Sequence, residues 1–85
     1  MQTPEYILDL HGYTVDETRK VLDAIFFKNN YSYIRIIFGK GIHSKNGPVL
    51  GQFVKRYLAK KSVRFNQAKI QNGGEGALEV FMNHK

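Results

Sequence analysis

The 85-residue chain contains no cysteine and no long uninterrupted run of hydrophobic residues. Without cysteine, neither a disulfide nor a thiolate zinc site can stabilise the fold, which must therefore rest on packing. No apolar run approaches the roughly 20 residues that a membrane helix needs, and residues 1–5 lack the basic-then-apolar pattern of a secretion signal. These absences favour one cytoplasmic domain over residues 1–85 and argue against a membrane partner.

The hydrophobic residues make up 42% of the chain, which is enough to build one small core. The charged residues are unevenly distributed around a net charge of +6. Residues 1–39 carry four Lys/Arg and five Asp/Glu, whereas residues 40–85 carry nine Lys/Arg and two Asp/Glu. This asymmetry favours a polyanionic partner such as a nucleic acid, with a solvated basic surface as the alternative.

Four segments have the apolar alternation or the β-branched and aromatic content of strands, namely residues 6–10, 33–38, 63–70 and 77–82. In the first segment, alternation places Leu8 and Leu10 on one face and Asp9 and His11 on the other.

Two further segments have the three- and four-residue spacing of helices. A capping box, Thr14 to Glu17, opens the first helix, and Asn46 followed by Pro48 opens the second. The buried stripes are predicted to be Thr18, Val21, Leu22, Ile25 and Phe26 in the first helix, and Leu50, Phe53, Val54, Tyr57 and Leu58 in the second. Four basic residues remain on the wet side of the second helix: Lys55, Arg56, Lys60 and Lys61.

The resulting order, βαβαββ, predicts an α/β fold. Each βαβ crossover makes its strands parallel, and the short Gly-rich connection before the last strand predicts an antiparallel hairpin. If both crossovers step in the same direction, both helices cover one face of the sheet. The other face is then open and available for a partner.

Ligands bind beyond the carboxyl ends of parallel strands, where residues 11–13 and 39–44 are expected to meet. Asp9 beside His11 suits proton transfer, because a carboxylate can orient an imidazole. The alternative is a strand-end aspartate that binds loop amides beside a locally packed histidine. Tyr13 is placed to stack on a base.

The Gly39-Lys40-Gly41 loop permits close approach of an anion and supplies a lysine near a helix N-terminus. It lacks the spacing of a Walker loop, and the alternative is a connection that needs positive φ angles. Three further polar residues follow in the same loop: His43, Ser44 and Lys45. Glu17 is assigned to the helix cap, and residues 73–76 read equally well as a turn or as a functional loop.

Four blocks of sequence resemble the Smr (small MutS-related) domain family. They are Leu-Asp-Leu-His-Gly at residues 8–12, Thr14 to Glu17 at the start of the first helix, Gly-Lys-Gly-Ile-His-Ser at residues 39–44, and Gly-Gly-Glu-Gly-Ala-Leu at residues 73–78. The resemblance implies a two-layer sandwich with sheet order 1-2-4-3 and both helices on one face, similar to the C-terminal domain of translation initiation factor three. It also implies nucleic-acid binding and, in many members, endonuclease activity.

By motif match, Asp9 and His11 would be catalytic, and the phosphate would be held by Gly39, Lys40, Gly41, His43 and Ser44 with nearby Lys45. Many members carry a basic residue after the position of Leu50. Here Gly51 occupies that place, which would weaken one phosphate contact or shift it to Lys55.

Two functions follow. The first is an endonuclease acting on RNA without a metal, or on branched or duplex DNA with a divalent ion such as Mg or Mn. Asp9 is the single secure carboxylate near the site, which favours the route without two metals. The second is a non-catalytic nucleic-acid-binding module that works with the rest of a MutS-like chain or with the ribosome. A protein-interaction domain using the open sheet face is a third, more distant reading.

Overall fold

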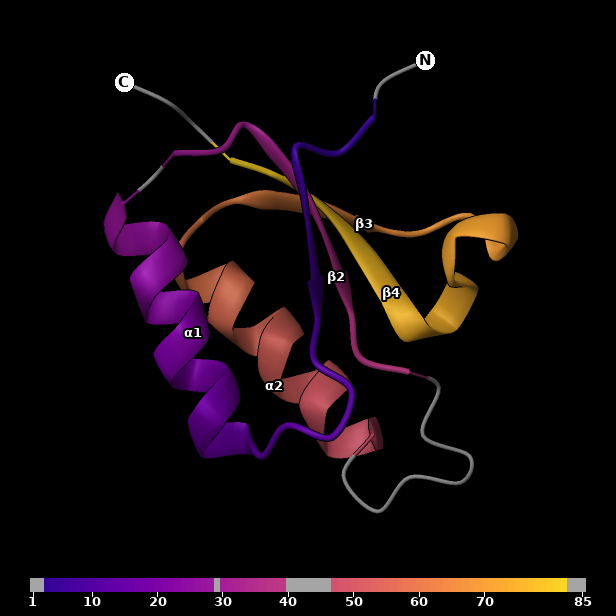
Figure 1. The fold of residues 1–85 in the computed structure, drawn as a ribbon, viewed down its shortest axis with the longest axis horizontal. Helices are drawn as coiled ribbons and strands as arrows, with labels where there is room; N and C mark the ends of the chain where they lie inside the picture. The colour runs from indigo at the N-terminus through magenta and orange to yellow at the C-terminus, as the bar shows by residue number, and fades with distance from the viewer. Residues whose placement is uncertain (1–2, 29, 40–46, 83–85) are drawn as a thin grey trace.

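The computed structural model describes residues 3–28, 30–39 and 47–82 (Figure 1). Its elements follow the predicted order βαβαββ, with two short 3-10 turns, η1 and η2, before the last strand. Their bounds are β1 Tyr6–Asp9, α1 Val15–Lys28, β2 Tyr33–Ile37, α2 Gly47–Lys60, β3 Arg64–Gln67, η1 Ile70–Asn72, η2 Gly74–Gly76 and β4 Ala77–Phe81. Neither helix in these segments is long and apolar enough to cross a membrane.

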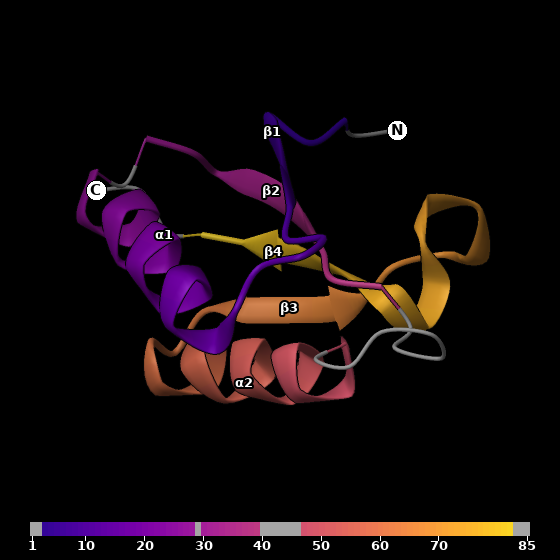
Figure 2. The ribbon, with the colours of Figure 1, turned by 60° about the horizontal axis from the view of Figure 1, so that its bottom comes forward.

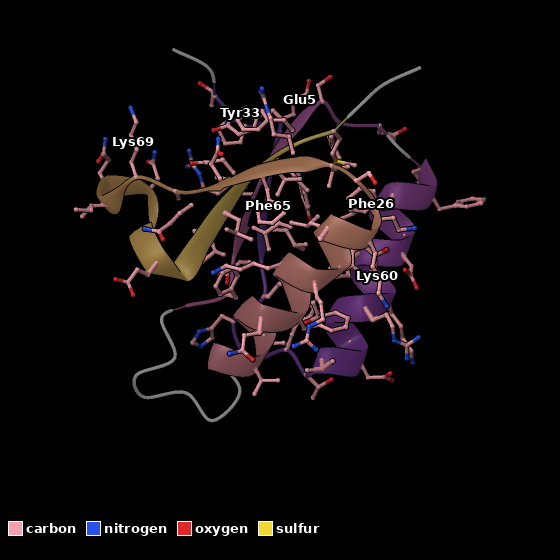
Figure 3. The ribbon with its side chains drawn as sticks, turned by 180° about the vertical axis from the view of Figure 1, so that it is seen from behind. Glu5, Phe26, Tyr33, Lys60, Phe65 and Lys69 are labelled. Carbon is pink, nitrogen blue, oxygen red and sulfur yellow. The ribbon has the colours of Figure 1, made fainter. Side chains whose placement is uncertain are left out.

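The four strands form one mixed sheet in the order β1-β2-β4-β3, as expected. β1 is parallel to β2, whereas β4 is antiparallel to both of its neighbours, β2 and β3. Figure 2 shows α2 beneath β3, with α1 alongside. Both helices contribute to a single core cluster that lies against one face of the sheet. The opposite face, called the open face below, is covered by neither α1 nor α2 (Figure 3).

The core is formed by the predicted apolar stripes. Leu22 of α1 and Leu50, Val54 and Leu58 of α2 are buried against alternate residues of the strands. The flanking stripe residues are half-buried and pack around this cluster: Val21, Ile25, Phe26, Phe53 and Tyr57. Burial of each large apolar side chain stabilises the fold by about 1.5–3 kcal/mol.

The start of α1 is fixed by local polar contacts. The main-chain N–H of Thr14 donates to Glu17 Oε1 at 2.9 Å, and the N–H of Glu17 donates to Thr14 Oγ1 at 3.1 Å. The capping box predicted from the sequence is therefore present in full, and Glu17 serves the helix terminus. This cap sets the direction in which the chain leaves the turn after β1.

The strand predicted over residues 63–70 is shorter than expected. β3 ends at Gln67, and the final ladder contact is the N–H of Ala68 donating to the carbonyl of Ala77. Beyond it the chain turns into η1, where Ile70 is 91% exposed. The turn ends at Gly73, whose φ of 118° favours glycine, and Ile70 gains no burial in it.

Candidate nucleic-acid interface

Three segments far apart in sequence meet at the carboxyl ends of β1 and β2. The N–H of Leu10 donates to the carbonyl of Ile37 at 2.7 Å. The N–H groups of Phe38 and Gly39 both donate to the carbonyl of Gly76, at 2.8 and 3.0 Å. We call this end of the sheet, formed by residues 10–13, 38–39 and 76, the loop end. The ends of β1 and β2 therefore lie side by side (Figure 1), whereas residues 40–44 of the expected meeting lie outside the described residues.

The turn after β1 is organised by Asp9. Its Oδ1 accepts the main-chain N–H of His11 at 2.9 Å, and the N–H of Tyr13 donates to the carbonyl of Leu10. Gly12 completes the turn with a φ of 81°, a conformation that favours glycine. Asp9 and His11 are both exposed.

The sequence led us to expect a hydrogen bond between the side chains of Asp9 and His11. In the described part of the chain, no hydrogen bond joins the Asp9 carboxylate to the His11 imidazole. The aspartate instead contacts a loop amide, which was the alternative interpretation of this pair. In the structure Asp9 shapes the turn that carries His11, and the imidazole projects from an exposed position.

The other predicted site residues differ in their burial and in whether the structure describes them. Tyr13 is half-buried and packs against the core, so only part of its ring is available for stacking. Gly39 has a φ of 82°, and a Cβ there would meet no atom within 4 Å, so its conformation rather than crowding requires glycine. Lys55 is exposed on α2. Five residues lie outside the described residues: Lys40, Gly41, His43, Ser44 and Lys45.

The structure gives a reason for glycine at position 51 that could not be read from the sequence. It is buried in α2, and a Cβ at this position would lie 2.8 Å from Cε1 of Phe38. Position 51 therefore faces the Phe38 ring. A larger side chain at this position would require the Phe38 ring to move, so packing gives a reason for glycine here. That a phosphate contact is weakened or shifted to Lys55 stays a prediction.

Replacing Gly51 by alanine is expected to lower the free energy of unfolding by about 1 kcal/mol. Overpacking against Phe38 costs about 1–3 kcal/mol, whereas the higher helix propensity of alanine returns somewhat less than 1 kcal/mol. Urea denaturation measures the difference. In a Phe38→Leu background the same substitution should become neutral or stabilising, and equal destabilisation in both backgrounds would show that the Phe38 contact is irrelevant.

The side chains that could bind a metal ion are sparse in the described part of the loop end. Within residues 3–28, 30–39 and 47–82, no three side chains of His, Asp or Glu lie close enough together to hold an ion. Asp9 also shares its carboxylate with the amide of His11. These residues do not match the converging carboxylates that a two-metal nuclease site needs.

Sequence reasoning missed a polar cluster on the open face. Arg35 Nε lies 3.0 Å from Glu79 Oε2, and the two side chains are only 14% and 12% exposed. The hydroxyl of Tyr33 donates to Glu79 Oε1 at 2.9 Å. The hydrogen bond to Glu79 raises the pKa of Arg35, while burial, reinforced by the bond to Glu79, raises the pKa of Tyr33. The sequence did contain a signal for this pair, because each of two otherwise apolar strands carries one charged residue, Arg35 in β2 and Glu79 in β4.

Comparisons with known proteins agree with this geometry. Residues 8–83 match the sequence profile of the Smr domain. The ribosome rescue factor SmrB of Aliivibrio fischeri is 32% identical over 85 residues, covering 94% of this chain and 45% of that protein. The Smr domain of Thermus thermophilus MutS2 superposes with a TM-score of 0.78 at 27% identity, over 93% of this chain and 99% of that one.

A third likeness is to YdaL, a stand-alone small MutS-related protein from Escherichia coli. It superposes with a TM-score of 0.78 at 26% identity, over 94% of this chain and 69% of that chain. The chain spans less than half the length of the bacterial curated relatives it matches, at 29% and 45%. Matched over nearly all of its sequence and fold, the chain belongs to the Smr domain family.

Proposed function

We propose that the chain is a nucleic-acid-binding domain that cleaves RNA at the loop end. The observation that carries the proposal is the joining of the His11 turn and the Gly39 segment through Leu10, Ile37 and Gly76. The exposed His11 turn and Gly39 therefore lie at the same end of the sheet, and Lys40 and Gly41 follow Gly39 in the sequence. A proton-transfer group and a phosphate-binding loop at one end of a sheet suit phosphodiester chemistry.

Charge supports binding of a polyanion. The exposed basic residues of α2 and the turn after it are Lys55, Arg56, Lys60 and Lys61. No acidic residue occurs in α2, and residues 40–85 carry an excess of seven positive charges. Contacts of such residues with phosphates release counterions, so affinity should fall steeply as salt rises.

RNA is the favoured substrate because its own 2′-hydroxyl can act as nucleophile. The 2′ oxygen attacks the adjacent phosphorus and the bond to the 5′ oxygen breaks, which leaves a 2′,3′-cyclic phosphate and a 5′-hydroxyl. His11 takes the proton of the 2′-hydroxyl and passes it to the departing 5′ oxygen. Lys40 and the amides of residues 39–41 offset the growing charge on the phosphate.

Cleavage of DNA would need activated water, which usually calls for a metal ion. The described carboxylates do not converge around Asp9, which argues against that route here. A divalent ion carried by the phosphates of a substrate would make cleavage sensitive to EDTA.

A non-catalytic role is the second candidate, and one observation favours it. The carboxylate of Asp9 is engaged by the amide of His11, so this pair is not arranged as an acid–base dyad before substrate binds. In that case the domain would grip nucleic acid for a larger protein. The similarity to a ribosome rescue factor and to a MutS2 domain suggests the ribosome, or the rest of a MutS-like chain, as the setting.

Labelled single-stranded RNA, duplex DNA and branched DNA should be incubated with the wild type and with Asp9→Ala/His11→Ala, with and without EDTA. Asp16→Ala, which removes an exposed carboxylate on α1, is the control. We expect RNA alone to be cut, in EDTA, by the wild type and the control but not by the double variant.

Four results would count against the proposal. Binding without any cut product supports the non-catalytic module. Cleavage of DNA that EDTA abolishes supports a metal-dependent route instead. Cutting that persists in the double variant removes the loop end as the site, and a 2′-deoxy residue at the cut position that fails to block cleavage removes the 2′-hydroxyl mechanism.

A further inference from the structure

A groove of about 570 Å³ lies on the open face of the sheet, away from the helices. Its floor consists of Tyr33, Arg35, Glu79 and Phe81 of the two central strands. Residues 3–4 form one wall and residues 69–72 the other. Figure 3 shows Tyr33 and Lys69 on this side of the sheet, with Phe65 on the helix side. The volume is typical of a site that holds one nucleotide-sized ligand.

The polar groups of the floor already have hydrogen-bond partners. Glu79 accepts hydrogen bonds from Arg35 and Tyr33, and no buried side-chain polar atom among the described residues lacks a partner. The ring of Tyr33 stacks on that of Phe81 with centroids 5.0 Å apart, and the guanidinium of Arg64 lies 4.8 Å from the Phe81 centroid. Tyr33 and Arg64 flank the Phe81 ring from the two neighbouring strands, so a ligand above the floor meets the outer edges of this row and is recognised by the rim.

The rim is rich in carboxamides. Asn66, Gln67, Gln71 and Asn72 line the groove and offer both donors and acceptors, the combination that reads the edges of nucleobases. Arg35 and Glu79 neutralise each other, which leaves Lys69 as the net charge of the lining. A planar ligand with mixed hydrogen-bonding edges and a negative group fits this lining.

The groove and the loop end lie along the same strand, β2, which carries Tyr33 and Arg35 and then ends beside the turn after β1. Ile7 pairs with Arg35 and Arg35 with Glu79, while two residues further along Asp9 pairs with Ile37. From Tyr33 to Ile37 the strand advances about 13 Å, at ~3.3 Å per residue. A single strand bound in the groove can therefore reach the turn that carries His11.

We propose that this groove binds an unpaired base and its phosphate from a single-stranded nucleic acid, next to the segment held at the loop end. The base lies over Tyr33 and Phe81, the carboxamides contact its edge, and Lys69 contacts its phosphate. A duplex cannot enter, because its bases are stacked and paired. The inference rests on the proposed nucleic-acid function and adds to it a preference for unpaired strands.

Binding of a fluorescein-labelled single-stranded oligodeoxynucleotide, and of its duplex, should be measured by anisotropy. The groove variant is Asn66→Ala/Lys69→Ala, and the control is Lys28→Ala/Asn30→Ala at the end of α1, which removes the same residue types and charge. All four positions are exposed, so both variants should fold. We expect the groove variant to lose about 5–20-fold in single-strand affinity relative to the control, with equal duplex affinities.

A cross-link on the wild type locates the base directly. A single-stranded oligonucleotide containing 5-iodouracil should photo-cross-link to Tyr33 or Phe81, as identified by peptide mass spectrometry. Equal single-strand affinities of the groove and control variants, or cross-links confined to Tyr13, would overturn the groove while leaving a loop-end nuclease intact. A wild type that binds no nucleic acid of either form overturns both the groove and the proposed function.

Discussion

Replacing Glu79 by alanine is expected to lower the free energy of unfolding by about 3 kcal/mol. The substitution leaves the Arg35 guanidinium, whose side chain is 14% exposed, without its carboxylate partner, and it removes the acceptor of the Tyr33 hydroxyl. Breaking a buried ion pair typically costs 3–5 kcal/mol, and the residual exposure here points to the lower end. Small domains have only about 5–15 kcal/mol of total stability, so the loss should be plain in urea or thermal denaturation.

Two further variants show whether the pair is responsible. Glu75→Ala removes an exposed carboxylate from η2 and should change stability by about 0.5 kcal/mol or less. Arg35→Met/Glu79→Leu replaces both charges with apolar groups and should recover most of the loss. If Glu79→Ala were no more destabilising than Glu75→Ala, the pair would contribute nothing to folding.

Replacing His11 by alanine is expected to lower the RNA cleavage rate about 10²–10⁴-fold, the usual contribution of a positioned acid–base group. RNA affinity should stay within about twofold of the wild type, because the imidazole is one contact among many phosphate contacts. Rates are measured under single-turnover conditions with RNA labelled at its 5′ end. Added imidazole should restore part of the activity, since it can replace the missing proton carrier.

Two substitutions at Asp9 distinguish a residue that positions His11 from one that takes part in the reaction. Asp9→Asn keeps an oxygen that can accept the N–H of His11, whereas Asp9→Ala does not. If Asp9 only shapes the turn, the asparagine variant should cleave at near wild-type rate and the alanine variant should not. If Asp9→Asn were inactive, the negative charge of Asp9 would be needed for the reaction.

If His11→Ala kept the wild-type cleavage rate and did not respond to imidazole, His11 would be excluded as the proton carrier.

Much of the fold could be predicted from local pattern alone. Leu8 and Leu10 alternate on one face of β1, and Thr14 with Glu17 fits a cap with a known geometry, so local physics determines these elements. The end of β3 could not be predicted in the same way. Its length depends on whether Ile70 gains burial from tertiary neighbours, and it does not.

The candidate site was less predictable because its contacts join distant segments. The two-residue spacing predicted that Asp9 lies near His11. It could not show whether the carboxylate accepts a hydrogen bond from the imidazole or from a main-chain amide. The Arg35–Glu79 pair links residues 44 apart, and the exclusion of a side chain at Gly51 depends on the Phe38 ring. Each of these needs the sheet order and the helix packing to be in place first.

The strand order also constrains how the chain becomes a folded protein. β4 is the last strand along the chain, yet it lies between β2 and β3. During synthesis β3 therefore emerges without its partner, and the sheet stays in two halves until residues 77–81 leave the ribosome. Cooperative folding should begin only then, and a chain truncated before β4 should be recognised by proteases as unfolded, however complete its helices are.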